Sequence, residues 1–124
     1  MKRLLVVKIV AGCFLTVVWS ASGAAKVDFA KEIQPILQQT CIKCHGPEKQ
    51  KGKMRLDSLQ AALKGSENGK VIEPGNSAKS VLVHNVSRIG DEDDWMPPPK
   101  DTKFPKFTPE EVGLVRAWID QGAK

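Results

Sequence analysis

Apolar residues recur at helical spacing most regularly near the C-terminus. The stripe there consists of Val112, Val115, Trp118 and Ile119. Thr108 is well placed to cap this helix, Pro109 fits its first turn, and Glu111 stands at the capping-box position. Gly122 follows the last apolar residue and should end the helix. The pattern therefore predicts a final helix that begins just after Thr108 and stops before Gly122.

Two weaker helical patterns lie earlier in the chain. Asp28 can cap the first, which runs toward Cys41, and because Pro35 lies inside it we expect two short pieces or a kink. Asp57 can cap the second, and Gly65 can end it. The apolar positions of the two segments are Phe29, Ile33, Ile36, Leu37, Leu59 and Leu63. Both segments are thus predicted to be short helices with one apolar face.

A further segment is ambiguous between helix and strand. Ser77 can cap a helix there, whereas the β-branched residues in the run at 81–83 favour a strand. The helix would place four residues on one face: Ala78, Leu82, Val86 and Ile89. Three loops are indicated: a lysine-rich one at residues 46–55, one with a Pro-Gly pair at residues 69–75, and one broken by prolines at residues 90–107. Together the patterns predict an all-α domain of three to five short helices with long loops.

The N-terminal segment has a different composition. Residues 1–3 are mostly basic, residues 9–19 form an apolar run, and small residues follow at 20–25. This order is typical of a secretory signal peptide, whereas a membrane span needs about twenty apolar residues. We therefore predict a signal peptide over residues 1–25 and one domain over residues 26–124, in a bacterial protein that is periplasmic or otherwise exported.

Two alternatives for this segment stay open. An uncleaved signal would leave the protein anchored in the membrane and facing the periplasm. Residues 10–13 resemble a bacterial lipobox, in which Cys13 would be lipidated. Against the lipobox, the apolar stretch before Cys13 is short and carries Lys8, and the apolar region continues beyond it. Only these two alternatives predict an association with the membrane.

Removal of the signal segment would also change the charge. Three of the nineteen basic residues lie in it and none of the fourteen acidic residues does, so sixteen basic and fourteen acidic residues remain. The net charge falls from +5 to +2, and the basic residues form no long tract. We therefore predict no nucleic-acid partner.

The candidate chemistry lies at residues 40–46, which read TCIKCHG. Cys41 and Cys44 are three residues apart, so on a helical turn both thiols face the same way. His45 follows directly, and C-x-x-C-H is the attachment sequence of c-type haem. The spacing predicts one covalent haem c, tethered by both cysteines, with His45 as the proximal iron ligand.

Two other interpretations of this motif have less support. A zinc site usually takes four ligands, but beyond residue 25 there is no further cysteine and only one further histidine, His84. A thioredoxin-like dithiol would need a βαβ setting, which the helical pattern does not supply. Export also favours haem, because bacteria attach haem to such motifs outside the cytoplasm.

The second axial ligand should come from a separate loop, because it must reach the face opposite His45. Met96 lies in such a loop, which three prolines at 97–99 stiffen. Met54 is expected on the same side as His45, and His84 is expected to be packed or half-exposed within an apolar segment. We therefore predict Met96 as the ligand. Histidine and methionine together raise the haem potential and leave no open position, which favours an electron carrier.

Over residues 27–123 the chain resembles the planctomycete-type cytochrome c domain, a class I-like c-type cytochrome. The matching stretches are VDFAKEIQPIL, CIKCHGP, GKMRLDSLQAALKG, VIEPGNSAKSVL, MPPP and FTPEEVGLVRAWIDQGA. The resemblance implies a small class I cytochrome c-like bundle around one covalent haem, attached at Cys41 and Cys44. It likewise implies axial ligation by His45 and Met96.

The resemblance also implies that the first and last helices cross, with Phe29 and Ile33 near Trp118. Domains of this type are commonly the N-terminal part of longer secreted proteins. We predict a periplasmic single-electron carrier, not a catalyst, that acts with redox partner proteins the sequence does not identify. Two alternatives stay open: a haem enzyme or gas-sensing haem protein with a displaceable Met96, and a docking module of a larger redox complex.

Overall fold

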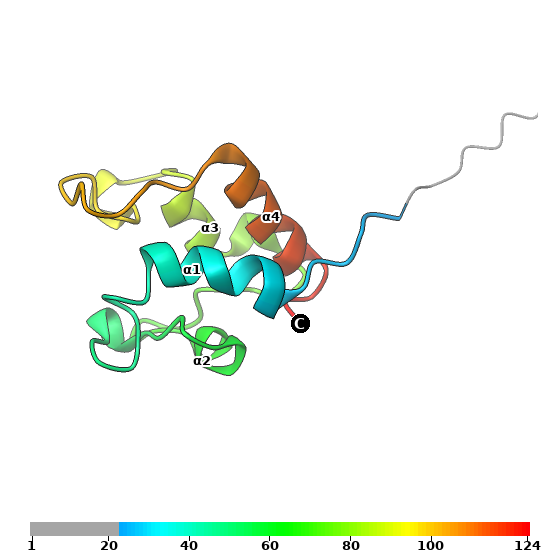
Figure 1. Cartoon of the computed structure of the whole chain (residues 1–124), viewed down its shortest axis with the longest axis horizontal. Helices are drawn as coiled ribbons and strands as arrows, with labels where there is room; N and C mark the ends of the chain where they lie inside the picture. Colours follow the sequence, from blue (N-terminus) through cyan, green and yellow to red (C-terminus); the bar gives the residue numbers. More distant parts are fainter. Residues whose placement is uncertain (1–22) are drawn as a thin grey trace, which may run out of the picture.

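The computed structural model describes residues 23–124 (Figure 1), so most of the predicted signal segment, including Lys8 and Cys13, lies outside the described residues. The described part contains four short α-helices: α1 (Gln34–Thr40), α2 (Leu59–Lys64), α3 (Val81–Val86) and α4 (Pro109–Asp120). Single 3₁₀ turns lie between them at Lys51–Lys53, Ser77–Lys79 and Glu92–Asp94. Within residues 23–124 there is no β-strand, only two isolated bridges. The prediction of an all-α domain with long loops is confirmed.

The first helical segment is divided in two, as its proline predicted. A π-helical turn at Phe29–Ile33 opens it, and the Asp28 side chain accepts a hydrogen bond from the backbone N–H of Lys31 at 3.0 Å. α1 follows directly, with Pro35 in its first turn. A proline is tolerated there because the first N–H groups of a helix have no partner within it. Both pieces contribute buried apolar residues to the core.

α4 is the longest helix of the described residues and lies across the N-terminal segment. The Thr108 hydroxyl accepts a hydrogen bond from the Glu111 N–H at 3.2 Å, and the Glu111 carboxylate accepts one from the Thr108 N–H at 2.8 Å. The predicted capping box is therefore present. The rings of Phe29 and Trp118 have their centroids 5.3 Å apart, and Figure 1 shows α4 against the start of the N-terminal segment. The helix contact that the resemblance implied is confirmed.

The predicted cap of α2 is wrong by one residue. Ser58 caps the helix, and its hydroxyl accepts a hydrogen bond from the Ala61 N–H at 3.2 Å. The Asp57 carboxylate instead forms two hydrogen bonds with Arg55, at 2.8 and 2.7 Å. A bidentate guanidinium is a stronger partner for a carboxylate than a backbone N–H, so the serine caps the helix. Gly65 follows α2 with a φ of +89°, as expected of a helix-ending glycine.

The predicted helix after Ser77 is shorter than expected and has a different face. Ser77 opens a 3₁₀ turn instead, because its N–H and hydroxyl donate to the two carboxylate oxygens of Asp120 at 2.8 and 2.9 Å. Asn76 caps that turn, and α3 starts only after it. Ile89 lies beyond the helix and is 51% exposed, so its predicted place on an apolar face is wrong. The alternative prediction of a strand is wrong as well.

The core lies where α4 packs against both α3 and the N-terminal helical segment. Its fully buried side chains include Ile33, Leu37, Leu56, Val83, Val115, Trp118 and Ile119. The loops that follow α1 and α3 line a cavity. No helix within residues 23–124 is long and apolar enough to span a bilayer.

Candidate functional site

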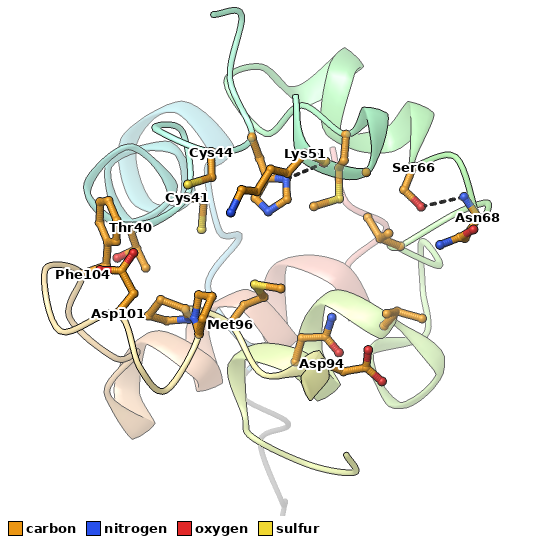
Figure 2. Close-up of a pocket in the computed structure, with 18 of the residues that line it drawn as sticks. Thr40, Cys41, Cys44, Lys51, Ser66, Asn68, Asp94, Met96, Asp101 and Phe104 are labelled. Carbon is orange, nitrogen blue, oxygen red and sulfur yellow. Dashed lines mark hydrogen bonds between the residues drawn. The ribbon is translucent and has the colours of Figure 1, made fainter. Parts of the chain in front are cut away.

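All four residues predicted for the site line one cavity. The cavity has a volume of about 380 Å³ and a largely apolar wall. Cys41, Cys44 and His45 reach it from the loop after α1, and Met96 reaches it from the loop after α3. Figure 2 shows the two cysteines at one end of the cavity and Met96 on another side. Segments that are distant in the sequence therefore meet at this point.

The attachment motif forms a turn directly after α1. The backbone N–H groups of Cys44 and His45 both donate to the carbonyl of Cys41, at 3.1 and 2.9 Å. The turn brings both thiols to the same end of the cavity, beside Thr40 and Phe104 (Figure 2). Burial raises the pKa of the Cys41 thiol to about 12, and the neighbouring Cys44 adds to the shift. Cys41 is therefore protonated at neutral pH.

His45 is held so that one ring nitrogen is free. Its Nδ1 lies 3.0 Å from the backbone carbonyl of Lys51. Because a carbonyl can only accept, Nδ1 carries the proton and Nε2 keeps its lone pair. Burial lowers the pKa of His45 despite the opposing effect of this hydrogen bond. The ring is thus neutral at physiological pH and can bind a metal without first losing a proton.

Backbone contacts fix the loop that positions His45. Lys51 N–H donates to the carbonyl of Cys44 at 2.9 Å, and Leu56 N–H donates to the carbonyl of His45 at 2.7 Å. A side chain at Gly46 would collide with the carbonyl of Ile42, so the close approach of the chain there requires glycine. The loop is therefore tied to the attachment turn on both sides of the histidine.

Met96 enters the cavity from the loop after α3. Its N–H donates to the carbonyl of Asn85, in the last turn of α3, at 3.0 Å. The following residue, Pro97, is buried, and the peptide bond between the two is cis. In Figure 2, Met96 lies across the cavity from Lys51. The backbone carbonyl of Lys51 is the hydrogen-bond partner of the His45 ring. The imidazole and the thioether thus belong to separate walls of one cavity.

The other two candidate ligands have different surroundings. Met54 also lines the cavity, is partly buried against the core, and follows the same 3₁₀ turn that contains Lys51. It therefore belongs to the wall that positions His45, as the sequence predicted. The Nε2 of His84 lies 2.7 Å from the carbonyl of Ala78, and His84 is not among the residues that line the cavity. Its side chain is half-buried.

Sequence reasoning missed other residues of the cavity wall. Asn85 lines the cavity from α3, and Asp94, Asp101 and Phe104 line it from the long loop before α4. A polar amide within an otherwise apolar helical run was the one available signal for Asn85. The loop residues gave no signal, because only tertiary packing brings them beside the cysteines.

These residues fit a covalently attached haem. The cavity offers two thiols at one end, a neutral imidazole, a thioether on another wall, and an apolar lining. Within the described residues, no three His, Cys, Asp or Glu side chains gather as a metal site. A zinc site built from such side chains therefore has no support in this part of the chain.

Part of the chain matches a known protein family. Residues 41–100 match the family model described as planctomycete cytochrome C. No curated protein sequence matches the chain. Among solved structures, a chain of Kuenenia stuttgartiensis hydrazine synthase is similar at 25% identity and a TM-score of 0.48. The match covers 78% of this chain but 16% of that one, so this chain spans about a sixth of its length.

The family match includes the attachment motif, the wall that holds His45, α2, α3 and the loop that carries Met96. It confirms the resemblance stated from the sequence. A domain of this kind implies covalently bound haem c and a haem-based redox function. This chain therefore contains, over residues 41–100, a planctomycete-type cytochrome c domain.

Proposed function

We propose that this chain is a single-electron carrier whose haem iron is ligated by His45 and Met96. The observation that carries the proposal is that both side chains line the cavity into which Cys41 and Cys44 point. A histidine and a methionine together raise the reduction potential and leave no iron position for a substrate. Such a site favours electron transfer over catalysis.

Cys41 and Cys44 would tether the cofactor. Each thiol would add across one vinyl group of a haem, with sulfur bonded to one carbon and the thiol hydrogen to the other, so no oxidant would be needed. Bound haem supplies an iron that changes its oxidation state by one electron. The sequence contains a single C-x-x-C-H motif, so we propose one haem per chain.

Contacts within the chain orient both proposed axial residues. The Lys51 carbonyl orients the His45 ring, and the Asn85 carbonyl holds the backbone of Met96. Prolines on the C-terminal side of Met96 restrict that loop further. Because the chain holds the His45 ring and the Met96 backbone, a bound iron would need little rearrangement of these residues to change its oxidation state.

Carbon monoxide tests this function against its main alternative. If Met96 occupies the sixth position, the reduced protein should bind carbon monoxide weakly and slowly. Rapid and tight binding would instead favour a haem enzyme or a gas-sensing protein with a displaceable Met96. A reduced protein that exchanges electrons with neither donors nor oxidants would favour a docking module whose haem is structural.

We also place this carrier in the periplasm, where it would exchange electrons with other redox proteins. The basic start and apolar run within residues 1–25 support export. Mass spectrometry of the exported protein should give the mass of residues 26–124 plus one haem. A mass that includes residues 1–25, or an added lipid at Cys13, would contradict the proposed cleavage.

A further inference from the structure

Arg88 ends α3 in a conformation that is unusual for its residue type. It lies two residues beyond the helix with a φ of +57°, in the left-handed region where glycine is favoured. Its N–H donates to the carbonyl of Asn85 at 3.3 Å, and the Ile89 N–H donates to the carbonyl of His84 at 2.9 Å. A glycine would satisfy these backbone bonds with less strain. The arginine side chain is therefore the feature that needs an explanation.

That side chain reaches the loop on both sides of Met96. An Nη of Arg88 donates to the carbonyl of Pro97 at 3.2 Å. The guanidinium carbon lies 5.4 Å from the ring centroid of Trp95, within the range of a cation–π contact. Arg88 thus contacts the residue before Met96 and the residue after it.

The loop has few other ways to attach to α3. The Met96 N–H bonds to the carbonyl of Asn85, but the prolines at 97–99 have no N–H to donate. The bond to Pro97 is the only hydrogen bond that the guanidinium makes within residues 23–124, and Arg88 Nε has no partner there. Loss of the side chain would therefore leave the Met96 loop attached mainly through one backbone bond.

We propose that Arg88 is a positioning residue that clamps the Met96 loop against α3 and so keeps the thioether in the cavity. This inference rests on the proposed ligation of iron by Met96. It adds that the strength of this ligation depends on a guanidinium that does not line the cavity. Without the clamp, the loop should open more often and an external ligand should reach the iron more easily.

The test is the binding of imidazole to the ferric holoprotein, followed optically. Arg88→Gly relieves the left-handed backbone but removes the clamp, so imidazole affinity should rise about tenfold or more, as the loss of a charged hydrogen bond predicts. Arg88→Lys keeps a charge near Trp95 but lacks the planar fork that reaches Pro97, and should give an intermediate rise. Should the glycine variant fail to fold, the lysine variant still tests the proposal.

Ala123→Gly provides the matched control. Ala123 is another non-glycine residue in the left-handed region, at a φ of +52°, and it lies after α4, outside the cavity wall. Its replacement should leave imidazole affinity unchanged. If Arg88→Gly also leaves the affinity unchanged, Arg88 only ends a helix and the clamp is overturned.

A fourth variant separates this inference from the proposed function. If Met96→Ala raises imidazole affinity and Arg88→Gly does not, Met96 is a ligand and only the clamp is overturned. If Met96→Ala leaves the affinity unchanged, Met96 does not occupy the iron, and both the ligation and the clamp are overturned. A rise in both variants, larger for Met96→Ala, supports both.

Discussion

Two neighbouring cysteines of the attachment motif have different surroundings. Cys41 is 7% exposed and its thiol is held protonated by burial, whereas Cys44 is half-buried. The thiolate is the reactive form of cysteine, so the two should react at different rates when haem is absent. The motif itself is local and was identified from the sequence, but this difference arises from the packing of Cys41 in the core.

Alkylation of the haem-free protein measures this difference. In folded apoprotein near neutral pH, iodoacetamide should modify Cys44 well before Cys41, because burial raises the pKa of Cys41 to about 12 and also limits access. Peptide mass spectrometry at successive times gives the order. In denaturant the two rates should become similar. Faster modification of Cys41 in the folded protein would contradict the structure.

At the level of helices, the sequence predicted a helix start where the capping residues bond only to each other. It did not predict a start where a capping residue bonds to another side chain. The start of α4 follows from Thr108 and Glu111, which bond to each other and to nothing distant. The cap of α2 was predicted wrongly because Asp57 has Arg55 as a stronger partner. Ser77 was misplaced because its partner, Asp120, is in another helix.

The capping box of α4 predicts a loss of stability that leaves the haem site unchanged. Thr108→Ala removes the acceptor for the Glu111 N–H and should lower the free energy of unfolding by about 1 kcal/mol. Urea unfolding of the holoprotein measures this. Thr108→Ser keeps the hydroxyl and should lose little. An equal loss in both variants would show that the methyl group of Thr108, and not the cap, stabilises the helix.

The contact between the N-terminal segment and α4 predicts a larger effect. Phe29 is buried and its ring packs against Trp118, so Phe29→Ala should lower the free energy of unfolding by about 3 kcal/mol or more. Phe29→Leu keeps most of the buried apolar surface and should lose clearly less. Denaturant unfolding compares the two. If Phe29→Ala unfolds like the wild type, the crossing of these helices does not stabilise the domain.

Across the whole molecule, the fold brings residues 41–54 and 94–104 to one cavity, a relation that no local pattern encodes. Met96 was predicted as the second axial ligand because this ligand must come from a separate loop, and the family resemblance implied the same residue. The contacts of Arg88 with Trp95 and Pro97 had no sequence signal, because a lone arginine in a turn has many possible partners. Exposed lysines lie around the attachment motif, and exposed acidic residues at 91–94 precede Met96.

This charge distribution predicts a salt dependence of electron transfer. Lys43 and Lys49 are exposed beside the attachment motif, so oxidation by the anion ferricyanide should become slower as ionic strength rises. Lys43→Gln with Lys49→Gln should remove much of this dependence in stopped-flow measurements. Lys79→Gln with Lys124→Gln removes the same charge away from the cavity and should have less effect. A rate that rises with salt would show that the acids at 91–94 dominate the approach.

The optical spectrum of the ferric holoprotein tests the proposed ligation most directly. The wild type should show the weak red absorption band of a methionine–iron bond. Met96→Ala should lose the band and lower the reduction potential, whereas Met54→Ala should keep it, because Met54 belongs to the wall of His45. An unchanged band in Met96→Ala, or its loss in Met54→Ala alone, would contradict His45 and Met96 as the axial pair.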